Sequence, residues 1–208
     1  MHPGTILVSP LLETLPWIEH GFGTRHAALS QDGMASLQQI HSAVVFAAAQ
    51  TGSAGEGDAL VTNQKNLSLS VRTADCFPIL LADVRRKAVA AVHAGWRGAA
   101  AEIIVKTLNK MVGQFGTEPA DIYAAIGPGI GRCCYEVGAE VAMRFGLEGI
   151  THIDLADINR RQLIEAGVPE HHIEIVGGCT QCDPARFYSY RRDRLEPGRL
   201  ISYIRVLG

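Results

Sequence analysis

Cys76 and His93 are the residues of this chain whose types and spacing could support chemistry. Cys76 follows an alternating segment and His93 ends an apolar run, so each lies where a predicted strand meets a loop. His41 stands just before another β-branched run, upstream of both. Cysteine sulfur and histidine nitrogen are ligands of zinc, and a catalytic zinc ion keeps three protein ligands and one open position. The three residues are therefore candidates for one metal site.

The same residues allow other interpretations. A cysteine thiolate beside a histidine base is a nucleophile, and such a pair needs only Cys76 and His93, without His41. A single cysteine after a strand can also be a buried apolar side chain with no chemical role. Spacing alone leaves the metal site, the nucleophile pair and the purely structural role open.

Asp75 and several arginines are the other candidates for a site. Asp75 adjoins Cys76 and could transfer protons, or it could equally hydrogen-bond its own loop, because adjacent side chains on an extended segment diverge. Guanidinium groups bind phosphate with two parallel hydrogen bonds. Five arginines stand at predicted loop edges: Arg25, Arg72, Arg97, Arg191 and Arg192. Our candidates for binding substrate or phosphate are Arg25, Arg72 and Arg97, the last close to a predicted helix N-terminus that favours anions.

Two apolar runs flank Cys76 and His93 and are expected to hold them in place. Residues 77–82 and 88–93 are joined by a polar turn, which predicts a buried β-hairpin. A helix is predicted from Trp96 or Arg97 to Val112, since apolar residues recur there with helical spacing. Residues 153–155 resemble a strand and 156–166 a helix. Strands outnumber helices and many are adjacent, so the sequence favours an α+β fold with mixed sheets.

Composition bounds the class of protein. The 208 residues fit one domain spanning 1–208, and a hydrophobic content of 47% suffices for a packed core. A net charge of −2 gives no reason to expect nucleic-acid or membrane-surface binding. No apolar run approaches the roughly 18 residues of a membrane span, and the N-terminus lacks a signal-peptide pattern. We therefore expect a cytoplasmic protein.

The five cysteines are an odd number that includes two adjacent residues, which favours a reducing compartment over a disulfide framework. Cys179 and Cys182 form a CxxC pair. A structural zinc site would need a second pair, and only the adjacent Cys133 and Cys134 are available. Because adjacent side chains rarely point the same way, we expect core or redox-inert roles for these four cysteines. The glycine-rich loop 127–132 matches no phosphate-binding pattern. It can be a tight turn whose glycines adopt positive φ, and its position after a strand also predicts a pocket wall.

Several long motifs occur in order along the chain. They are Gln39-Ile-His41, Asp58-Ala-Leu-Val-Thr62, Thr73-Ala-Asp-Cys-Phe-Pro78, Val92-His-Ala-Gly-Trp-Arg-Gly98, Ile126-Gly-Pro-Gly-Ile-Gly-Arg-Cys-Cys-Tyr-Glu-Val-Gly138 and Ser189-Tyr-Arg-Arg-Asp193. Together they resemble the multicopper polyphenol oxidase or laccase-like family, whose members are also called peptidoglycan editing factors. The resemblance runs from about Gly21 to the C-terminus.

The resemblance implies a four-layer α/β/β/α sandwich and one zinc ion held by His41, Cys76 and His93. It implies phosphorolysis of adenosine, inosine, guanosine or methylthioadenosine, and hydrolytic deamination of adenosine. The implied partners are a purine nucleoside and phosphate, with no nucleic acid or membrane, in a monomer or weak homodimer. The older family name implies copper, but one cysteine and two histidines form only one mononuclear site.

Three rival functions stay open. They are a cysteine hydrolase using Cys76 and His93, a copper polyphenol oxidase, and a non-catalytic metal-binding partner in peptidoglycan-precursor editing. The chain also departs from the family. Between Gly33 and Met34 family members are expected to carry a further stretch that includes a helix, which is either deleted in this chain or missing from the given sequence. The family's Ser-Thr-Arg-x-Gly-Gly is changed to Gly23-Thr-Arg-His-Ala-Ala28. Any nucleoside or phosphate contacts made by this region are therefore left open.

Overall fold

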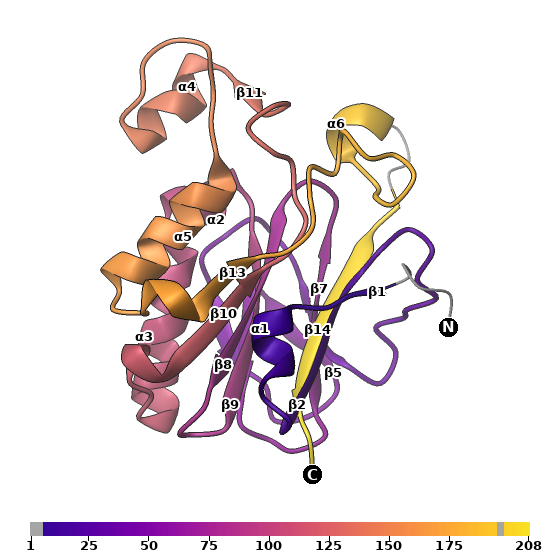
Figure 1. The fold of residues 1–208 in the computed structure, drawn as a ribbon, viewed down its shortest axis with the longest axis vertical. Coiled ribbons are helices and arrows are strands. Elements are labelled where there is room, and N and C mark those ends of the chain that lie inside the picture. Colours follow the sequence, from indigo (N-terminus) through magenta and orange to yellow (C-terminus); the bar gives the residue numbers. More distant parts are fainter. Residues whose placement is uncertain (1–5, 195–197) are drawn as a thin grey trace.

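Two six-stranded mixed sheets stack face to face in the computed structural model, which describes residues 6–194 and 198–208 (Figure 1). The first sheet has the order β1 (Ile6–Leu7), β2 (Ile18–Gly23), β14 (Leu200–Val206), β7 (Ser68–Thr73), β3 (Ala35–Gln38) and β5 (Gly52–Glu56). The second has the order β13 (Ile173–Ile175), β10 (Ile122–Ile126), β8 (Phe77–Asp83), β9 (Ala88–Ala94), β6 (Ala59–Thr62) and β4 (Val45–Ala47). A small ribbon pairs β11 (Glu136–Val137) with β12 (Thr151–His152).

The longer helices cover the outer face of the second sheet (Figure 1). They are α2 (Trp96–Ala100), α3 (Ile103–Phe115) and α5 (Leu155–Glu165). Single turns form α1 (Pro10–Glu13), α4 (Ala139–Ala142) and α6 (Tyr190–Asp193), with 3₁₀ turns at Pro119–Asp121, Met143–Phe145 and Glu170–His172. No helix within the described ranges is long and apolar enough to cross a membrane.

The predicted α+β class with mixed sheets is confirmed. The described residues place helices of more than one turn on one outer face only, so three of the four predicted layers are present. The outer face of the first sheet has no such helix among the described residues.

The predicted hairpin is confirmed and positions the central pair. Strands β8 and β9 run antiparallel from the Phe77–Ala94 pair to the Asp83–Ala88 pair, and every residue in both is buried. Burial on both faces follows because helices cover one side of this sheet and the other sheet covers the opposite side. The antiparallel register places Cys76, just before β8, at the same end as His93, the second-last residue of β9.

Two local predictions are wrong. The single helix from Trp96 to Val112 is broken into α2 and α3, because Glu102 adopts a left-handed backbone with φ of 58° that interrupts the helix. Residues 153–155 are not a strand. The Asp154 carboxylate accepts the backbone N–H of Asp157 at 3.0 Å and caps α5, so Leu155 begins that helix.

Candidate metal centre

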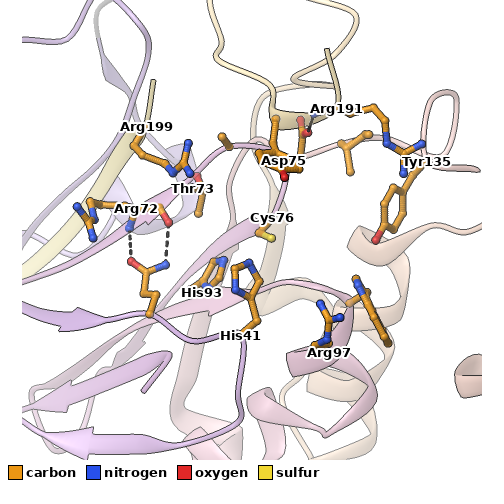
Figure 2. Close-up of a pocket in the computed structure, with 15 residues that line it drawn as sticks. His41, Arg72, Thr73, Asp75, Cys76, His93, Arg97, Tyr135, Arg191 and Arg199 are labelled. Atoms are coloured by element: carbon orange, nitrogen blue, oxygen red, sulfur yellow. Dashed lines mark hydrogen bonds between the residues drawn. The ribbon is translucent and has the colours of Figure 1, made fainter. Parts of the chain in front are cut away.

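His41, Cys76 and His93 converge at one end of the two sheets. Their ligand atoms all lie within 4.8 Å of one another, and the two imidazole rings meet edge to face with centroids 4.9 Å apart. Figure 2 shows both rings beside the Cys76 sulfur. His41 lies in the loop between β3 and β4, far in sequence from the β8–β9 hairpin. Two imidazole nitrogens and one thiolate form a donor set that fits a three-ligand metal site with an open position.

Asp58 orients two of these ligands, and the sequence reasoning did not select it. It directly precedes β6 and is fully buried. One carboxylate oxygen accepts His93 Nδ1–H at 2.8 Å and the His41 backbone N–H at 3.0 Å. The other accepts the backbone N–H and the hydroxyl of Ser42 at 2.5 and 2.6 Å. Because Nδ1 of His93 is engaged, Nε2 is the nitrogen left for a ligand, as is typical of metal-binding histidines.

Hydrogen bonds within the cluster shift the pKa values of Cys76, His93 and Asp58 towards their charged forms. Burial would raise the pKa of the Cys76 thiol, but hydrogen bonds with His41 and His93 lower it to about 7. Burial would lower the pKa of His93, but hydrogen bonds with Asp58 and Cys76 raise it to about 9. Burial would raise the pKa of Asp58, but His93 and Ser42 lower it to about 2. The Cys76 thiol and the Asp58 carboxyl therefore lose their protons more readily than usual, and their negative charges stabilise a cation nearby.

Gly95 makes the close approach of these residues possible. Gly95 is the single residue between β9 and α2. A Cβ atom there would lie 2.8 Å from Cys76 Sγ and 3.3 Å from His41 Cδ2. These distances are shorter than ordinary van der Waals contact, so any side chain at this position would displace a ligand.

Gly95→Ala is expected to lower the affinity of the site for zinc by about tenfold or more, because ligand displacements of this kind disturb coordination geometry. Competition with a chromogenic chelator measures that affinity. Gly113→Ala is the matched control. Gly113 lies within α3 with no atom within 4 Å of its added Cβ, so the change should keep the affinity and stabilise the helix by about 0.5–1 kcal/mol. Equal zinc affinities for both variants would contradict the role of Gly95.

A pocket of about 580 Å³ opens over the cluster (Figure 2). This volume is within the range of small-molecule sites. Its lining includes four arginines and three aromatic side chains, which are Arg72, Arg97, Arg191, Arg199, Trp96, Tyr135 and Tyr190. Cationic groups can bind an anion and aromatic rings can pack on a planar base, so the pocket suits a ligand that carries both.

Arg72 and Arg97, two of the arginines expected to bind substrate or phosphate, line this pocket. The Gln39 side chain fixes the Arg72 backbone by donating to its carbonyl at 2.7 Å and accepting its N–H at 2.8 Å (Figure 2). The Arg97 guanidinium lies over the Trp96 ring, 4.4 Å from its centroid. Both side chains are exposed enough to meet a ligand.

Arg25, the third arginine expected to bind substrate or phosphate, does not line this pocket. Its guanidinium donates to the Pro184 carbonyl at 2.5 Å and lies 4.9 Å from the centre of the Tyr188 ring. The neighbouring His26 ring contacts the Ala185 carbonyl at 2.7 Å. The altered segment after Gly23 therefore packs on the loop that precedes α6.

Asp75 has the hydrogen bonds of a loop-positioning residue. One carboxylate oxygen accepts the Thr180 hydroxyl at 2.6 Å, and the other accepts the Arg191 backbone N–H at 2.7 Å. Its own carbonyl accepts the Ile130 N–H at 2.8 Å, and its φ is 86°. These contacts fit the second of the two roles considered for Asp75, and they place Ile130 and Arg191 in the pocket wall.

Tyr135 is a further pocket residue that the sequence reasoning missed. Burial raises the pKa of Tyr135 to about 12, and the negative charges of Cys76 and Asp75 act in the same direction. Its hydroxyl therefore stays protonated at neutral pH and can donate a hydrogen bond. The sequence signal was its place after the glycine-rich loop, whose predicted contribution to a pocket wall is confirmed at Ile130.

Residues 23–207 match the family model described as multi-copper polyphenol oxidoreductase laccase. A purine nucleoside phosphorylase of Deinococcus radiodurans is 43% identical over 183 residues, covering 83% of this chain and 70% of that protein. The adenosine deaminase RL5, from an unknown prokaryotic organism, is 38% identical over 161 residues, covering 71% of this chain and 61% of that protein.

A solved structure, the hypothetical protein YfiH of Bacillus licheniformis, superposes with a TM-score of 0.90 at 25% identity, covering 99% of this chain and 97% of that one. The chain spans about three fifths of the length of several other curated phosphorylases. Because the family model covers nearly the whole sequence, the chain belongs to the multi-copper polyphenol oxidoreductase laccase family.

Proposed function

We propose that this chain is a zinc-dependent purine nucleoside phosphorylase that also deaminates adenosine. The observation that carries the proposal is the convergence of His41, Cys76 and His93 in a pocket lined by arginines and aromatic rings. The names of two similar proteins, a purine nucleoside phosphorylase and an adenosine deaminase, support it. The substrates would be phosphate and adenosine, inosine, guanosine or methylthioadenosine.

His41, Cys76 and Nε2 of His93 would hold the zinc ion, which supplies Lewis acidity towards a phosphate or water oxygen. Asp58 fixes the His93 tautomer by accepting Nδ1–H, so the ring presents its other nitrogen without rotation. The same carboxylate accepts the His41 backbone N–H and holds that residue in place.

In phosphorolysis, a phosphate oxygen forms a bond to ribose C1′ while the bond from C1′ to the purine N9 breaks. The purine leaves with the bonding electrons and takes up a proton. Arg72 and Arg97 would bind the phosphate oxygens, and Trp96 restrains Arg97 by stacking on its guanidinium. Tyr135, which keeps its proton, would donate a hydrogen bond to the bound substrate.

The full chain should therefore be incubated with adenosine in the presence and in the absence of phosphate. We expect adenine and ribose 1-phosphate only when phosphate is present, and inosine in both cases. Metal analysis of the purified protein distinguishes zinc from the copper that the family name suggests. A metal-loaded chain that converts no purine nucleoside would overturn the proposal and favour a non-catalytic partner role.

Arg97→Gln is expected to raise the KM for phosphate by roughly ten- to a hundredfold, because a charge-assisted hydrogen bond is worth about 1.5–3 kcal/mol. The KM for the nucleoside should change much less, and initial rates with each substrate varied in turn measure both. Arg85→Gln is the control, since Arg85 is 76% exposed and lies outside this pocket. An equal rise in both KM values would argue against phosphate binding by Arg97.

A cysteine hydrolase is the second candidate, and one observation favours it. Cys76, His93 and Asp58 are arranged as a nucleophile, a base and the carboxylate that orients the base. In that mechanism the activity would survive chelation and would be destroyed by iodoacetamide. The zinc mechanism predicts activity that chelators remove and added zinc restores.

A further inference from the structure

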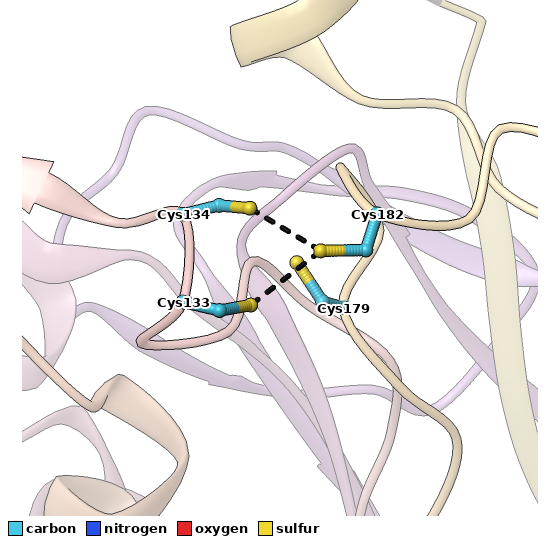
Figure 3. Close-up of side chains that lie close together, drawn as sticks. All are labelled: Cys133, Cys134, Cys179 and Cys182. Carbon is cyan, nitrogen blue, oxygen red and sulfur yellow. Dashed lines mark hydrogen bonds between the residues drawn. The ribbon is translucent and has the colours of Figure 1, made fainter.

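Four cysteine sulfurs gather at a second place, outside the pocket. Cys133 and Cys134 follow β10, and Cys179 and Cys182 follow β13 (Figure 3). The Cys182 sulfur lies 3.3 Å from that of Cys134 and 3.5 Å from that of Cys133, and all four sulfurs lie within 4.8 Å of one another. The expectation that the adjacent cysteines would not point the same way is therefore wrong.

The backbone explains this convergence. The N–H groups of Cys134 and Tyr135 both donate to the Gly131 carbonyl, at 2.9 and 3.0 Å, so this segment is a helical turn and not a strand. Successive side chains of such a turn diverge by about 100° instead of 180°, which lets both sulfurs face one side. A strand would have pointed them to opposite sides.

The opposing CxxC segment is held against that turn. Cys179 forms an isolated β-bridge with Gly129, and the Thr180 N–H donates to the Gly129 carbonyl at 2.9 Å. A Cβ atom on Gly131 would lie 3.2 Å from Cys179 Cβ and 3.3 Å from Cys133 Sγ. A glycine at position 131 therefore allows the two pairs to approach.

The spacing of the sulfurs suits a tetrahedral ion. Zinc–sulfur bonds of about 2.3 Å place tetrahedral sulfurs roughly 3.8 Å apart. The Cys182 sulfur lies 3.5 and 3.3 Å from those of Cys133 and Cys134, a few tenths of an ångström below that value, and no pair of the four sulfurs is more than 4.8 Å apart. All of these separations exceed the roughly 2.05 Å of a disulfide bond.

Backbone donors around Cys179 also favour an anionic sulfur at that position. The backbone N–H groups of Gly131 and Cys182 hydrogen-bond to the Cys179 sulfur. The Arg192 guanidinium, which is also paired with the Asp193 carboxylate, donates to the carbonyls of Thr180 and Gln181 and fixes the backbone of the CxxC loop. The two N–H groups offset part of the negative charge that four thiolates would bring to one ion.

We propose that Cys133, Cys134, Cys179 and Cys182 form a structural metal site for one tetrahedral divalent ion, zinc or iron, distinct from the site in the pocket. Those two metals are the ones that four-sulfur tetrahedral sites select. Each thiol releases its proton on binding, and four protein ligands leave no position open for substrate.

The ion would join two loops that wall the pocket. The turn at 131–135 leads from Ile130 to Tyr135, and the CxxC loop leads to Tyr190 and Arg191. A metal clip between these loops restricts the chain between them in the unfolded state and holds both walls in the folded state.

The decisive variant is His41→Ala combined with Cys76→Ser. It removes two pocket ligands and leaves the quartet as the chain's remaining cysteines. We expect this double variant to retain one zinc or iron ion per chain by elemental analysis, whereas the unsubstituted chain retains two. Cobalt(II) added to the metal-depleted double variant should give the intense thiolate-to-cobalt absorption of a tetrahedral sulfur site. Further substitution with Cys179→Ser and Cys182→Ser should remove both the ion and the absorption.

A folded double variant that takes up neither zinc, iron nor cobalt would overturn the site. So would a disulfide between Cys182 and Cys133 or Cys134 in chain purified under nitrogen, detected by mass spectrometry without reductant. If the quadruple variant fails to fold, the cobalt titration of the double variant still shows whether the four cysteines bind a metal ion. None of these readouts depends on enzymatic activity, so they are independent of the proposed phosphorolysis.

Discussion

His41→Ala is expected to release the ion from the pocket and to lower kcat/KM for adenosine phosphorolysis by roughly a thousandfold. His41 is one of three ligands, and Lewis acidity contributes several kcal/mol to the stabilisation of the transition state. At 1.36 kcal/mol for each factor of ten, about 4 kcal/mol corresponds to that loss. Steady-state rates combined with metal analysis of the same preparations measure both effects.

The backbone conformation of His41 makes a second substitution at this position necessary. Its φ of 58° lies in the left-handed region, which histidine and asparagine tolerate better than alanine, so His41→Ala changes the backbone preference as well as the metal ligand. His41→Asn tolerates this conformation and should lose activity to a similar extent. His152→Ala, at an exposed histidine on β12, is the control that should change neither property.

The same variants distinguish the two candidate mechanisms. A nucleophile pair needs Cys76 and His93 but not His41. If His41→Asn retained full activity while His93→Ala abolished it, the cysteine hydrolase would be the better account, and the three-ligand zinc mechanism would fail.

The centre is preorganised by strained backbone that its neighbours hold in place. His41 and Asp75 both adopt positive φ, at 58° and 86°, although neither is glycine. The Asp58 carboxylate accepts the N–H groups of His41 and Ser42, and the Ile130 N–H donates to the Asp75 carbonyl. Strain of this kind persists where surrounding contacts fix it, and it clusters at functional sites.

Local patterns in the sequence were enough to predict the hairpin at the centre of the site. Two uninterrupted apolar runs around a polar turn indicate strands buried on both faces, which β8 and β9 are. The antiparallel register then places Cys76 near His93. The approach of His41 depends on pairing between distant segments, so spacing alone left it open and only the family motifs predicted it.

Asp58 shows why the rest of the site was harder to predict. An acidic residue between a glycine and a strand resembles an ordinary turn residue in the sequence. Its role depends on the register of β6 with β9, in which Ala59 pairs with Val92 and the His93 N–H donates to the Asp58 carbonyl at 2.7 Å. The cysteine quartet likewise depends on turn conformation, which residue spacing does not specify.

Asp58→Asn is expected to lower the zinc affinity of the pocket by about 10- to 100-fold and the free energy of unfolding by about 3 kcal/mol. Each carboxylate oxygen accepts two hydrogen bonds, one oxygen from His41 and His93 and the other from Ser42. An asparagine NH₂ group at either position would face two donors. The substitution therefore loses contacts although it preserves the shape of the side chain.

Chelator competition measures the affinity change in Asp58→Asn, and urea unfolding followed by circular dichroism measures the stability change. Asp83→Asn is a matched control in the same sheet. Asp83 is also fully buried, but only one of its oxygens accepts hydrogen bonds, from the N–H groups of Arg85 and Arg86. The other has no hydrogen-bond partner among the described residues, so an NH₂ group there displaces no donor. We expect Asp83→Asn to leave zinc affinity unchanged. If Asp58→Asn also left it unchanged while destabilising the fold, Asp58 would support the structure of the loop without tuning the metal ligands.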